Sequence, residues 1–411
     1  MREGQRSVAH WWGRTFRSLA VPNYRSYFAG QAVSVIGIWM QRVAQDWLVL
    51  EISDSAVAVG VAMALQFLPT LVLGIYGGVL VDRVDRRRAI IATQSVSAVL
   101  AAVLAAVTLT DVVTLWMIYA LALTLGFVTV VDVPARHAFV TEMVEPADYV
   151  NAQALNSTIH NAGRLVGPAI AGILIASVGA GLVFAVNALS FLAVLAGLLR
   201  IDTRRLRRAP PMARSRGQAM AGLRYVWSHD ELRACMLLVA VVALLGQNFR
   251  VVLPLLARET FDGGAEIYGW LTSALGAGAV LGALASAARQ TATAWSLLLW
   301  TFAFAAANGV AAFSPALAVA LMAMVALGVA NICFNTLART MLQLGTEPSM
   351  QGRVSALHSM VFLGSTPIGG PALGWVCEAW GPRAGLGVAS LTTGLAALAV
   401  LPRLRALRLP S

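Results

Sequence analysis

The segment DVPARHAFVTEMVEPADYVNAQALNS (residues 132–157) has a second copy in the same chain, NTLARTMLQLGTEPSMQGRVSALHS (residues 335–359). The matched residues are Ala135 and Arg136 with Ala338 and Arg339, Glu145 and Pro146 with Glu347 and Pro348, and, further on, Gly167 and Pro168 with Gly370 and Pro371. Earlier in the chain, Arg42 of the first half corresponds to Arg250 of the second. A repeat on this scale predicts two parallel halves of one design, which is a plan found in membrane transporters.

Apolar stretches long enough to cross a bilayer recur along the whole chain. Of the 411 residues, 58% are hydrophobic and only 12% are charged, whereas soluble domains carry about 25% charged residues. A membrane-spanning helix needs about 20 apolar residues. Twelve spans are predicted, at residues 25–50, 55–80, 89–109, 113–133, 152–176, 180–199, 232–257, 266–288, 293–313, 316–337, 354–378 and 384–402. The fold class is therefore an all-α integral membrane protein of two pseudo-symmetric six-helix bundles.

The positions of the basic residues predict the orientation of the spans. The chain has 30 basic residues and a net charge of +11, and every basic residue is an arginine. In the twelve-span scheme, 25 of the 30 arginines fall on one side, which by the positive-inside rule is the cytoplasmic side. Both termini are then cytoplasmic, and the charge indicates orientation rather than a nucleic-acid partner. The absence of lysine excludes nucleotide hydrolysis by a P-loop.

Five regions follow from this scheme. They are a cytoplasmic arm (1–24), a first bundle (25–200), a cytoplasmic linker (201–231), a second bundle (232–402) and a cytoplasmic tail (403–411). Residues 216–230 of the linker form either a short amphipathic helix on the leaflet, with Arg216 and Arg224 near the headgroups, or a solvated loop. The three cysteines lie in predicted spans without paired spacing, so no disulfide, metal site or cofactor is expected.

The stretch GGVLVDRVDRRR (77–88) follows the second span. Its glycine permits close helix contact, and its charges suit a helix end near anionic lipid. The stretch resembles the loop signature G-x-L-x-D-R-x-G-R-R of the major facilitator superfamily, through Gly78, Leu80, Asp82, Arg83, Arg86 and Arg87. Asp85 stands where that pattern has glycine. The resemblance implies a cytoplasmic gate that closes in the outward-facing state. Asp132 and Arg136, at the cytoplasmic end of span four, are predicted to belong to the same gate. The alternative is a charge cluster that only sets topology.

The stretch GRLVGPAIAG (163–172) lies in the fifth span. Small residues four apart let helices approach closely, and a proline bends the helix. Gly163, Gly167, Pro168 and Gly172 resemble the superfamily's antiporter motif G-x-x-x-G-P-x-x-G-G, from which Ala171 departs. The resemblance implies an exporter that exchanges substrate for protons, whereas ordinary close packing would explain the glycines alone.

Longer stretches are similar to one group within the superfamily. They are MQRVAQDWLVLE (40–51), DRVDRRR (82–88), DVPARHAFVTEMV (132–144) and NAQALNS with NAGRLVGPAIAGILIA (151–176). They resemble the transmembrane secretion effector group, the enterobactin exporter-like drug:proton antiporters. The similarity is dense over residues 20–200 and thinner in the second half.

Charged residues stand inside the first span, in WMQRVAQDW (39–47). Ionised side chains in a bilayer are costly and usually face a cavity or a functional partner. Arg42 and Asp46 are four residues apart, so they can pair along the helix. Asp46 is the only carboxylate well inside a predicted span, which makes it the candidate proton-coupling group, with Arg42 beside it. The alternative is a permanent structural pair.

Other polar residues on the same and facing spans are candidates for a substrate cavity. They are Gln41, Gln45, Asn156, His160, Arg164, Asn248 and Arg250. The arginines inside the spans outnumber the one deep aspartate, and this excess of positive charge favours an anionic or amphipathic substrate. The alternative is that these arginines bond backbone carbonyls.

These features predict a multi-pass protein of the bacterial cytoplasmic membrane that acts as a monomer. It would export a small molecule, such as a drug, siderophore or other metabolite, by proton antiport and alternating access. The open alternatives are a proton-coupled importer of the same fold and a membrane receptor or assembly partner. No nucleophile–base pair or metal-ligand spacing indicates an enzyme.

Overall fold

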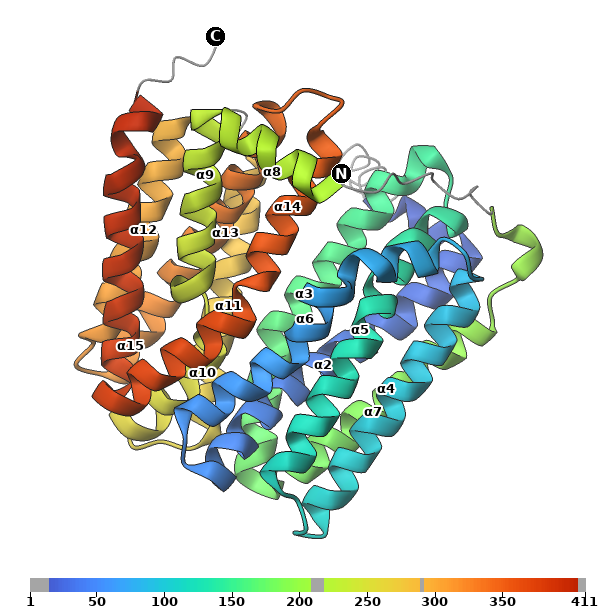
Figure 1. The fold of residues 1–411 in the computed structure, drawn as a ribbon. Coiled ribbons are helices and arrows are strands. Elements are labelled where there is room, and N and C mark those ends of the chain that lie inside the picture. The colour runs from blue at the N-terminus through green and yellow to red at the C-terminus, as the bar shows by residue number, and fades with distance from the viewer. Residues whose placement is uncertain (1–14, 208–217, 289–291, 406–411) are drawn as a thin grey trace, which may run out of the picture.

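The computed structural model describes residues 15–207, 218–288 and 292–405, and the regular structure within them is helical. Figure 1 shows two helical bundles side by side, the first drawn from blue to green and the second from yellow to red. Parts of the expected arm (1–14), linker (208–217, with Arg216) and tail (406–411) lie outside the described residues.

The first bundle is built from six long helices. They are α2 (Pro22–Ser53), α3 (Ala56–Val81), α4 (Arg86–Leu109), α5 (Leu115–Met143), α6 (Tyr149–Val178) and α7 (Ala180–Leu199), with short 3₁₀ turns η1 (Arg17–Ala20), η2 (Pro146–Asp148) and η3 (Thr203–Arg205). Several helices extend beyond the predicted spans because they continue through polar residues that hydropathy leaves out. α5, for example, continues ten residues past its predicted end at 133.

A short helix and a second bundle follow. α8 (Gln218–Ser228) lies within the segment expected to be amphipathic. The second bundle contains α9 (Asp230–Val241), η4 (Val242–Gly246), α10 (Phe249–Leu255), η5 (Leu256–Thr260), α11 (Ala265–Ala287), α12 (Ala294–Ala312), α13 (Leu317–Leu344), α14 (Gln351–Gly364) and α15 (Thr366–Arg405). Met220, Leu223 and Trp227 of α8 are exposed large apolar side chains.

The described helices account for the predicted number of spans. Among the residues that the structure describes, ten segments are long and apolar enough to cross a membrane. The last of them (351–402) contains a kink at Gly381 and makes two passes. α2 is long enough but is not among the ten, because it carries polar and charged residues along its length. With α2 added and the kinked segment counted twice, the described residues make twelve passes, consistent with the expectation.

The seventh pass differs from the continuous helix expected at 232–257. It consists of α9 and α10 separated by the π-helical turn η4 and the non-helical residues Gln247 and Asn248, and a second π-helical turn, η5, follows α10. π-helical turns insert an extra residue into a helix and often occur at functional sites. Pro254 adds to the irregularity because it has no N–H to donate to the carbonyl of Arg250.

The repeat is visible in backbone geometry as well as in sequence. Asp54 after α2 and Asp262 after η5 are both left-handed, with φ of 51° and 47°. Gly179 after α6 and Gly381 within α15 share φ of 81° and 82°. These positive φ values are uncommon for non-glycine residues and mark tight helix ends. Equivalent turns therefore close equivalent helices in the two halves.

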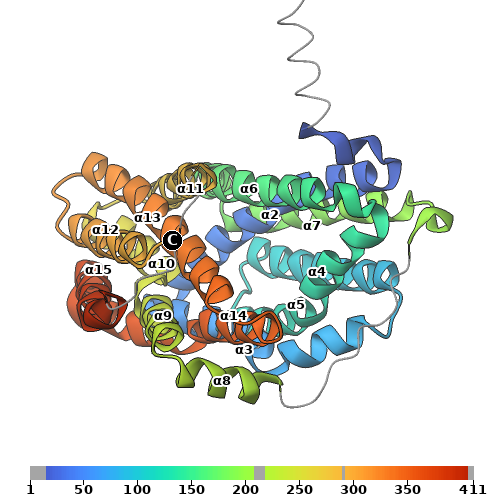
Figure 2. The same ribbon diagram turned by 90° about the horizontal axis from the view of Figure 1, so that it is seen from above.

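Glycines bring the two halves into close backbone contact along two equivalent seams. A Cβ on Gly172 of α6 would lie 2.8 Å from the carbonyl oxygen of Ala265, the first residue of α11. A Cβ on Gly374 of α15 would lie 2.6 Å from that of Ala56, the first residue of α3. Figure 2 shows α6 beside α11 and α3 beside α14 and α15. The sequence repeat thus becomes a pseudo-symmetric interface.

The two ends of the molecule differ in how the halves meet. We call the end with α8 and the α3–α4 turn the linker end, and the end with the turns 54–55 and 261–264 the far end (Figure 1). The glycine seams at Ala56 and Ala265 lie at the far end, since these residues begin the helices that start there. The far end is therefore closed by direct contact between the halves.

Adding a methyl group at a seam is expected to destabilise the protein. In Gly60→Ala the new Cβ would lie 2.5 Å from the carbonyl oxygen of Gly370, which is backbone and cannot move aside. Overpacking of this kind costs about 1–3 kcal/mol. Gly60→Ala should lower the melting temperature of the purified protein by several degrees. The control is Gly387→Ala, whose Cβ meets nothing within 4 Å and should leave melting unchanged or raise it. Equal melting of Gly60→Ala and wild type would contradict the close seam.

Candidate functional site

A buried ion pair joins the two halves. Arg250 of α10 donates to both carboxylate oxygens of Asp46 of α2, with Nε–Oδ2 at 2.8 Å and Nη2–Oδ1 at 2.7 Å. The hydroxyl of Tyr268 from α11 also donates to Oδ2 at 3.0 Å. The Asp46 side chain is only 1% exposed. This bidentate geometry is the strong form of a charge-assisted hydrogen bond.

Two further contacts hold the ion pair in place. Nη1 of Arg250 donates to the side-chain oxygen of Gln66 in α3 at 3.2 Å. The ring of Trp47 stacks on Tyr268, with centroids 6.5 Å apart and planes at 21°. Four elements from both halves, α2, α3, α10 and α11, therefore meet at one ion pair, to which the broken seventh pass contributes the arginine.

The partner of Asp46 differs from the one expected. Arg42 was expected to pair with Asp46 along α2, but both oxygens of Asp46 bond to Arg250 from the other half. Arg42 instead lies over the ring of Trp39, with its guanidinium carbon 4.6 Å from the ring centroid. Arg164 of α6 approaches the same ring at 5.8 Å. A pair across the interface replaces a pair within one helix, because α10 comes close enough to compete.

The antiporter-like motif determines how α6 packs. A Cβ on Gly167 would lie 2.6 Å from Cβ of Trp39, and one on Gly163 would lie 2.6 Å from Cγ1 of Val35. These two glycines therefore let α6 approach α2 in the same half, whereas Gly172 contacts α11 in the other half. Pro168 lies inside α6, and its carbonyl faces Gly269 of α11. The motif thus places Arg164 and sets the seam at the same time.

Polar contacts between the halves continue to the far end. Arg258 of η5 pairs with Asp54 at 2.8 Å and donates to the carbonyl of Leu50 at 3.4 Å. From α15, one carboxylate oxygen of Glu378 accepts from the Ser55 hydroxyl at 2.7 Å and from the Val57 amide at 3.2 Å. Glu378 therefore caps the first turn of α3, a helix of the opposite half.

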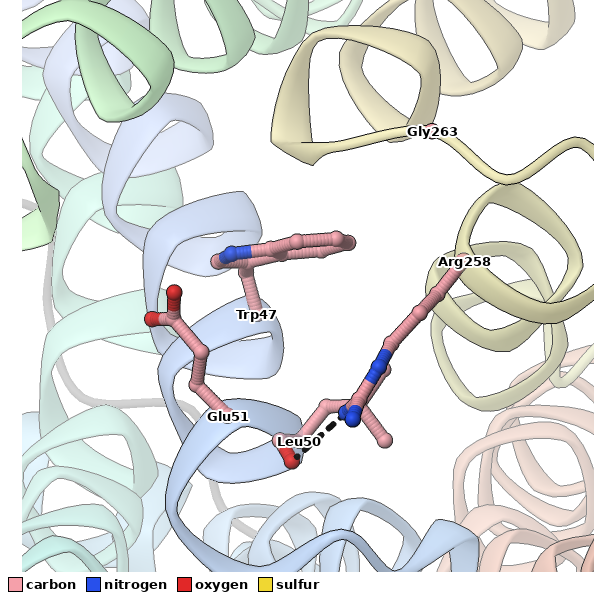
Figure 3. Close-up of a pocket in the computed structure, with 5 residues that line it drawn as sticks. All are labelled: Trp47, Leu50, Glu51, Arg258 and Gly263. Carbon is pink, nitrogen blue, oxygen red and sulfur yellow. Dashed lines mark hydrogen bonds between the residues drawn. The ribbon is translucent and has the colours of Figure 1, made fainter.

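A pocket of about 330 Å³ lies beside these contacts. Its lining residues are Trp47, Leu50, Glu51, Arg258 and Gly263. In Figure 3 the ring of Trp47 extends toward Arg258 and the loop at Gly263, the Glu51 side chain points away from them, and the dashed line marks the bond from Arg258 to Leu50. Because Trp47 stacks on Tyr268, the pocket is one ring away from the residue that binds Asp46.

The predicted gate residues at the linker end form a network within the first half. Arg86 pairs with Glu142 at 2.8 Å and lies 3.8 Å from Asp82, and Arg87 donates to the carbonyl of Leu198 at 2.8 Å. Asp85 accepts from the amide of Arg88 and caps α4, which accounts for an aspartate where the family pattern has glycine. Gly78 lies in the last turn of α3, where its carbonyl accepts from the amide of Asp82, and Arg83 lies in the turn that joins α3 to α4. A gate between the halves at this end stays a prediction.

Asp132 and Arg136 also belong to the network of the first half. They pair at 2.7 Å, and Asp132 accepts further from Thr93 at 2.7 Å and from Gln94 at 2.8 Å. Arg136 donates to Gln31 of α2 at 3.2 Å. The pair therefore ties α5 to α4 and α2.

The expected cavity residues are distributed over several contacts. Gln41 accepts from Asn187 of α7, and Asn248 donates to the carbonyl of Leu244 in its own pass, so both are hydrogen-bonded within their own half. Gln45 is buried, and no hydrogen-bond partner of its side-chain nitrogen is present among the described residues. His160 is exposed, and its Nδ1 lies 2.8 Å from the carbonyl of Asn156. The polar face of α2 bonds to four neighbouring helices, α5, α7, α10 and α11, rather than lining one cavity.

Sequence reasoning missed Tyr268, Gln66 and Glu378. Gln66 was the detectable one, because it is the only amide or charged side chain in the otherwise apolar stretch 56–81. A lone polar side chain at membrane depth usually has a polar partner.

Comparison with known proteins gives the same family as the sequence motifs. A family model described as "Transmembrane secretion effector" matches residues 14–410. The chain belongs to the transmembrane secretion effector family. The resemblance to this group of the major facilitator superfamily is thereby confirmed, and the protein is a multi-pass membrane transporter.

Two relatives of this secretion effector are transporters of named compounds. The enterobactin exporter EntS of Shigella boydii serotype 18 is 27% identical over 402 residues, covering 94% of each chain. The staphyloferrin A transporter of Staphylococcus aureus (strain NCTC 8325 / PS 47) is 26% identical over 261 residues. That match covers 63% of this chain and 65% of the relative, which is less than two thirds of the relative's length.

Solved structures share the fold of this secretion effector. The nucleoside transporter NupG (D323A mutant) superposes with a TM-score of 0.77 at 11% identity, covering 93% of this chain and 99% of that chain. An inward-facing bacterial homologue of ferroportin superposes with a TM-score of 0.70 at 14% identity, covering 92% and 98%. At these identities the likeness confirms the major facilitator fold alone.

Removing Arg250 should cost more stability than removing the whole ion pair. Arg250→Gln leaves the buried Asp46 carboxylate without its partner, and breaking a buried pair in this way costs about 3–5 kcal/mol. The double variant Asp46→Asn/Arg250→Gln removes both charges and should melt above the single variant. Arg258→Gln is the matched control, since its partner Asp54 is 81% exposed and such pairs are worth at most about 1 kcal/mol. Additive losses in the double variant would show that the two side chains do not depend on each other.

Proposed function

We propose that this transporter exports a small metabolite of the siderophore class across the bacterial cytoplasmic membrane, in exchange for protons. The observation that carries the proposal is the buried Asp46 carboxylate, bonded by Arg250 and Tyr268 of the opposite half. The substrate class comes from the named relatives, which are an enterobactin exporter and a staphyloferrin A transporter. In this proposal the linker end faces the cytoplasm.

The ion pair offers a way to couple protons to conformation. It holds α2 against α10 while the far end is closed, and protonation of Asp46 removes the charge that attracts Arg250. Protonation of Asp46 therefore favours the conformation in which α2 and α10 are apart. Because the proton binds more tightly to that conformation than to the closed one, its binding shifts the equilibrium between them. Opening of the far end exposes Asp46 to external protons. The far end then closes with the proton bound, and loss of that proton to the cytoplasm restores the bond between Asp46 and Arg250.

The polar contacts at the far end fit the same cycle. Arg258 with Asp54, and Glu378 with the start of α3, join the halves at the closed far end, and opening of that end would break them. At the linker end, the Asp82–Arg86 region is proposed to make the corresponding closure in the outward-facing state. The two sets of contacts would then alternate.

A cellular experiment tests both the cargo and the role of Asp46. The gene is deleted, and the strain is complemented with wild type, with Asp46→Asn or with Glu231→Gln, whose carboxylate is exposed on α9. A metabolite should accumulate inside the deletion strain and the Asp46→Asn strain but not in the other two, as measured by mass spectrometry of cell extracts.

The direction of transport is then measured with that metabolite. Inverted vesicles containing wild type or Glu231→Gln should take it up in response to a pH gradient, whereas Asp46→Asn vesicles should not respond. Undiminished proton-driven uptake by Asp46→Asn would remove Asp46 from the mechanism. Uptake into intact cells driven by an inward proton gradient would establish an importer instead.

A further inference from the structure

Two arginines converge on one tryptophan in the first bundle. The guanidinium carbon of Arg42 lies 4.6 Å from the ring centroid of Trp39, and that of Arg164 lies 5.8 Å from it. The three residues come from α2 and α6, which Gly163 and Gly167 bring into close contact. Trp39 is therefore fixed against the backbone of α6, and the two cations share a defined position.

The charges around this cluster do not balance. Arg250 is neutralised by Asp46, and Arg136 is neutralised by Asp132. Among the described residues, neither Arg42 nor Arg164 has an ion pair or a hydrogen bond. Each makes a cation–π contact with the ring of Trp39. Their guanidinium groups also act on each other, since Arg42 lies within electrostatic reach of Arg164, Arg250 and Arg136.

Unpaired cations at this depth imply a missing counter-charge. A cation over an aromatic ring recovers only a small part of the solvation that it loses in the membrane. One alternative is that these arginines bond backbone carbonyls, and no such bond is formed within the described part of the chain. All three side chains are half-buried rather than sealed, so a ligand can still reach them.

We infer that Arg42, Trp39 and Arg164 form the binding site for the acid groups of the transported molecule, which is an organic anion with at least two such groups. Guanidinium groups bind carboxylates through paired, parallel hydrogen bonds. Two guanidinium groups beside one indole ring suit a planar anion. The plane of the anion would contact the indole, and each of its acid groups would bind one arginine. The inference rests on the proposed transport function, because it names the substrate class for that function.

Separate groups would then handle the substrate and the proton. The sequence predicts Arg42 as part of the proton-coupling pair, but here Arg42 is assigned to the substrate site. The proton-coupling pair is Asp46 with Arg250. Export of an anion is also favoured by a membrane potential that is negative inside. The charge of the substrate would therefore add to the driving force for export.

Binding to the purified full-length protein tests the site without any need for transport. The probes for calorimetric titration in lipid nanodiscs are phthalate, succinate and neutral phthalamide. Wild type should bind phthalate and should bind phthalamide at least tenfold more weakly, since each charge-assisted hydrogen bond lost costs on the order of tenfold in affinity. Weaker binding of succinate would show that the indole contributes, and equal binding would limit the site to charge recognition.

Two variants and one control locate the site. Arg42→Gln and Arg164→Gln should each weaken phthalate binding by about tenfold or more. Arg25→Gln, an exposed arginine of the same helix α2, should bind as wild type does. Because the two site arginines lack a protein counter-charge, their removal should leave the melting temperature unchanged or raise it, in contrast to Arg250→Gln.

The outcomes separate this inference from the transport proposal. Failure of wild type to bind phthalate more tightly than phthalamide would overturn the anion site, and so would melting losses in Arg42→Gln and Arg164→Gln as large as that of Arg250→Gln. Anion binding that depends on both arginines, without export of any metabolite in cells, would leave the site standing and overturn the proposed function.

Discussion

The bidentate bond between Arg250 and Asp46 constrains the rest of this molecule. An isolated carboxylate that is 1% exposed inside a membrane bundle would be very costly. The second half must therefore deliver a guanidinium to one point on α2, and the seventh pass is interrupted on both sides of α10, the short helix that carries Arg250. From two more helices, Tyr268 donates to Asp46 and Gln66 accepts from Arg250. The geometry of four passes is thus tied to one ion pair.

The packing around this bond is nearly symmetric, but the bond itself is not. Gly172 against Ala265 and Gly374 against Ala56 are equivalent contacts in the two halves. The residue of the second half that corresponds to Asp46 is Pro254. The symmetric glycine contacts hold the halves together without deciding what is transported, whereas the chemistry is concentrated in the half that retains the carboxylate.

Local sequence predicted the parts of the fold that depend on local patterns. The apolar spans, the repeat and the small-residue motif of α6 are encoded within a few tens of residues, and the family comparison confirms the fold class that they imply. The partner of Asp46 could not be found in this way, because Arg250 lies 204 residues away in sequence. An equally plausible partner, Arg42, stood one helical turn from it. Which of the two arginines bonds to Asp46 depends on the break in the seventh pass. Pro254 is the one local sequence feature that indicates this break.

The cap that Glu378 places on α3 makes the first turn of that helix depend on the position of the other half. The Ser55 hydroxyl accepts from the amide of Ala58 whatever the position of the other half, but an amide at a helix start that has no acceptor is exposed to water more readily. When the far end opens, the Val57 amide loses the carboxylate that accepts its hydrogen bond. The rate at which this single amide exchanges its hydrogen with solvent would therefore follow the fraction of molecules open at the far end, as a native reporter that needs no attached label.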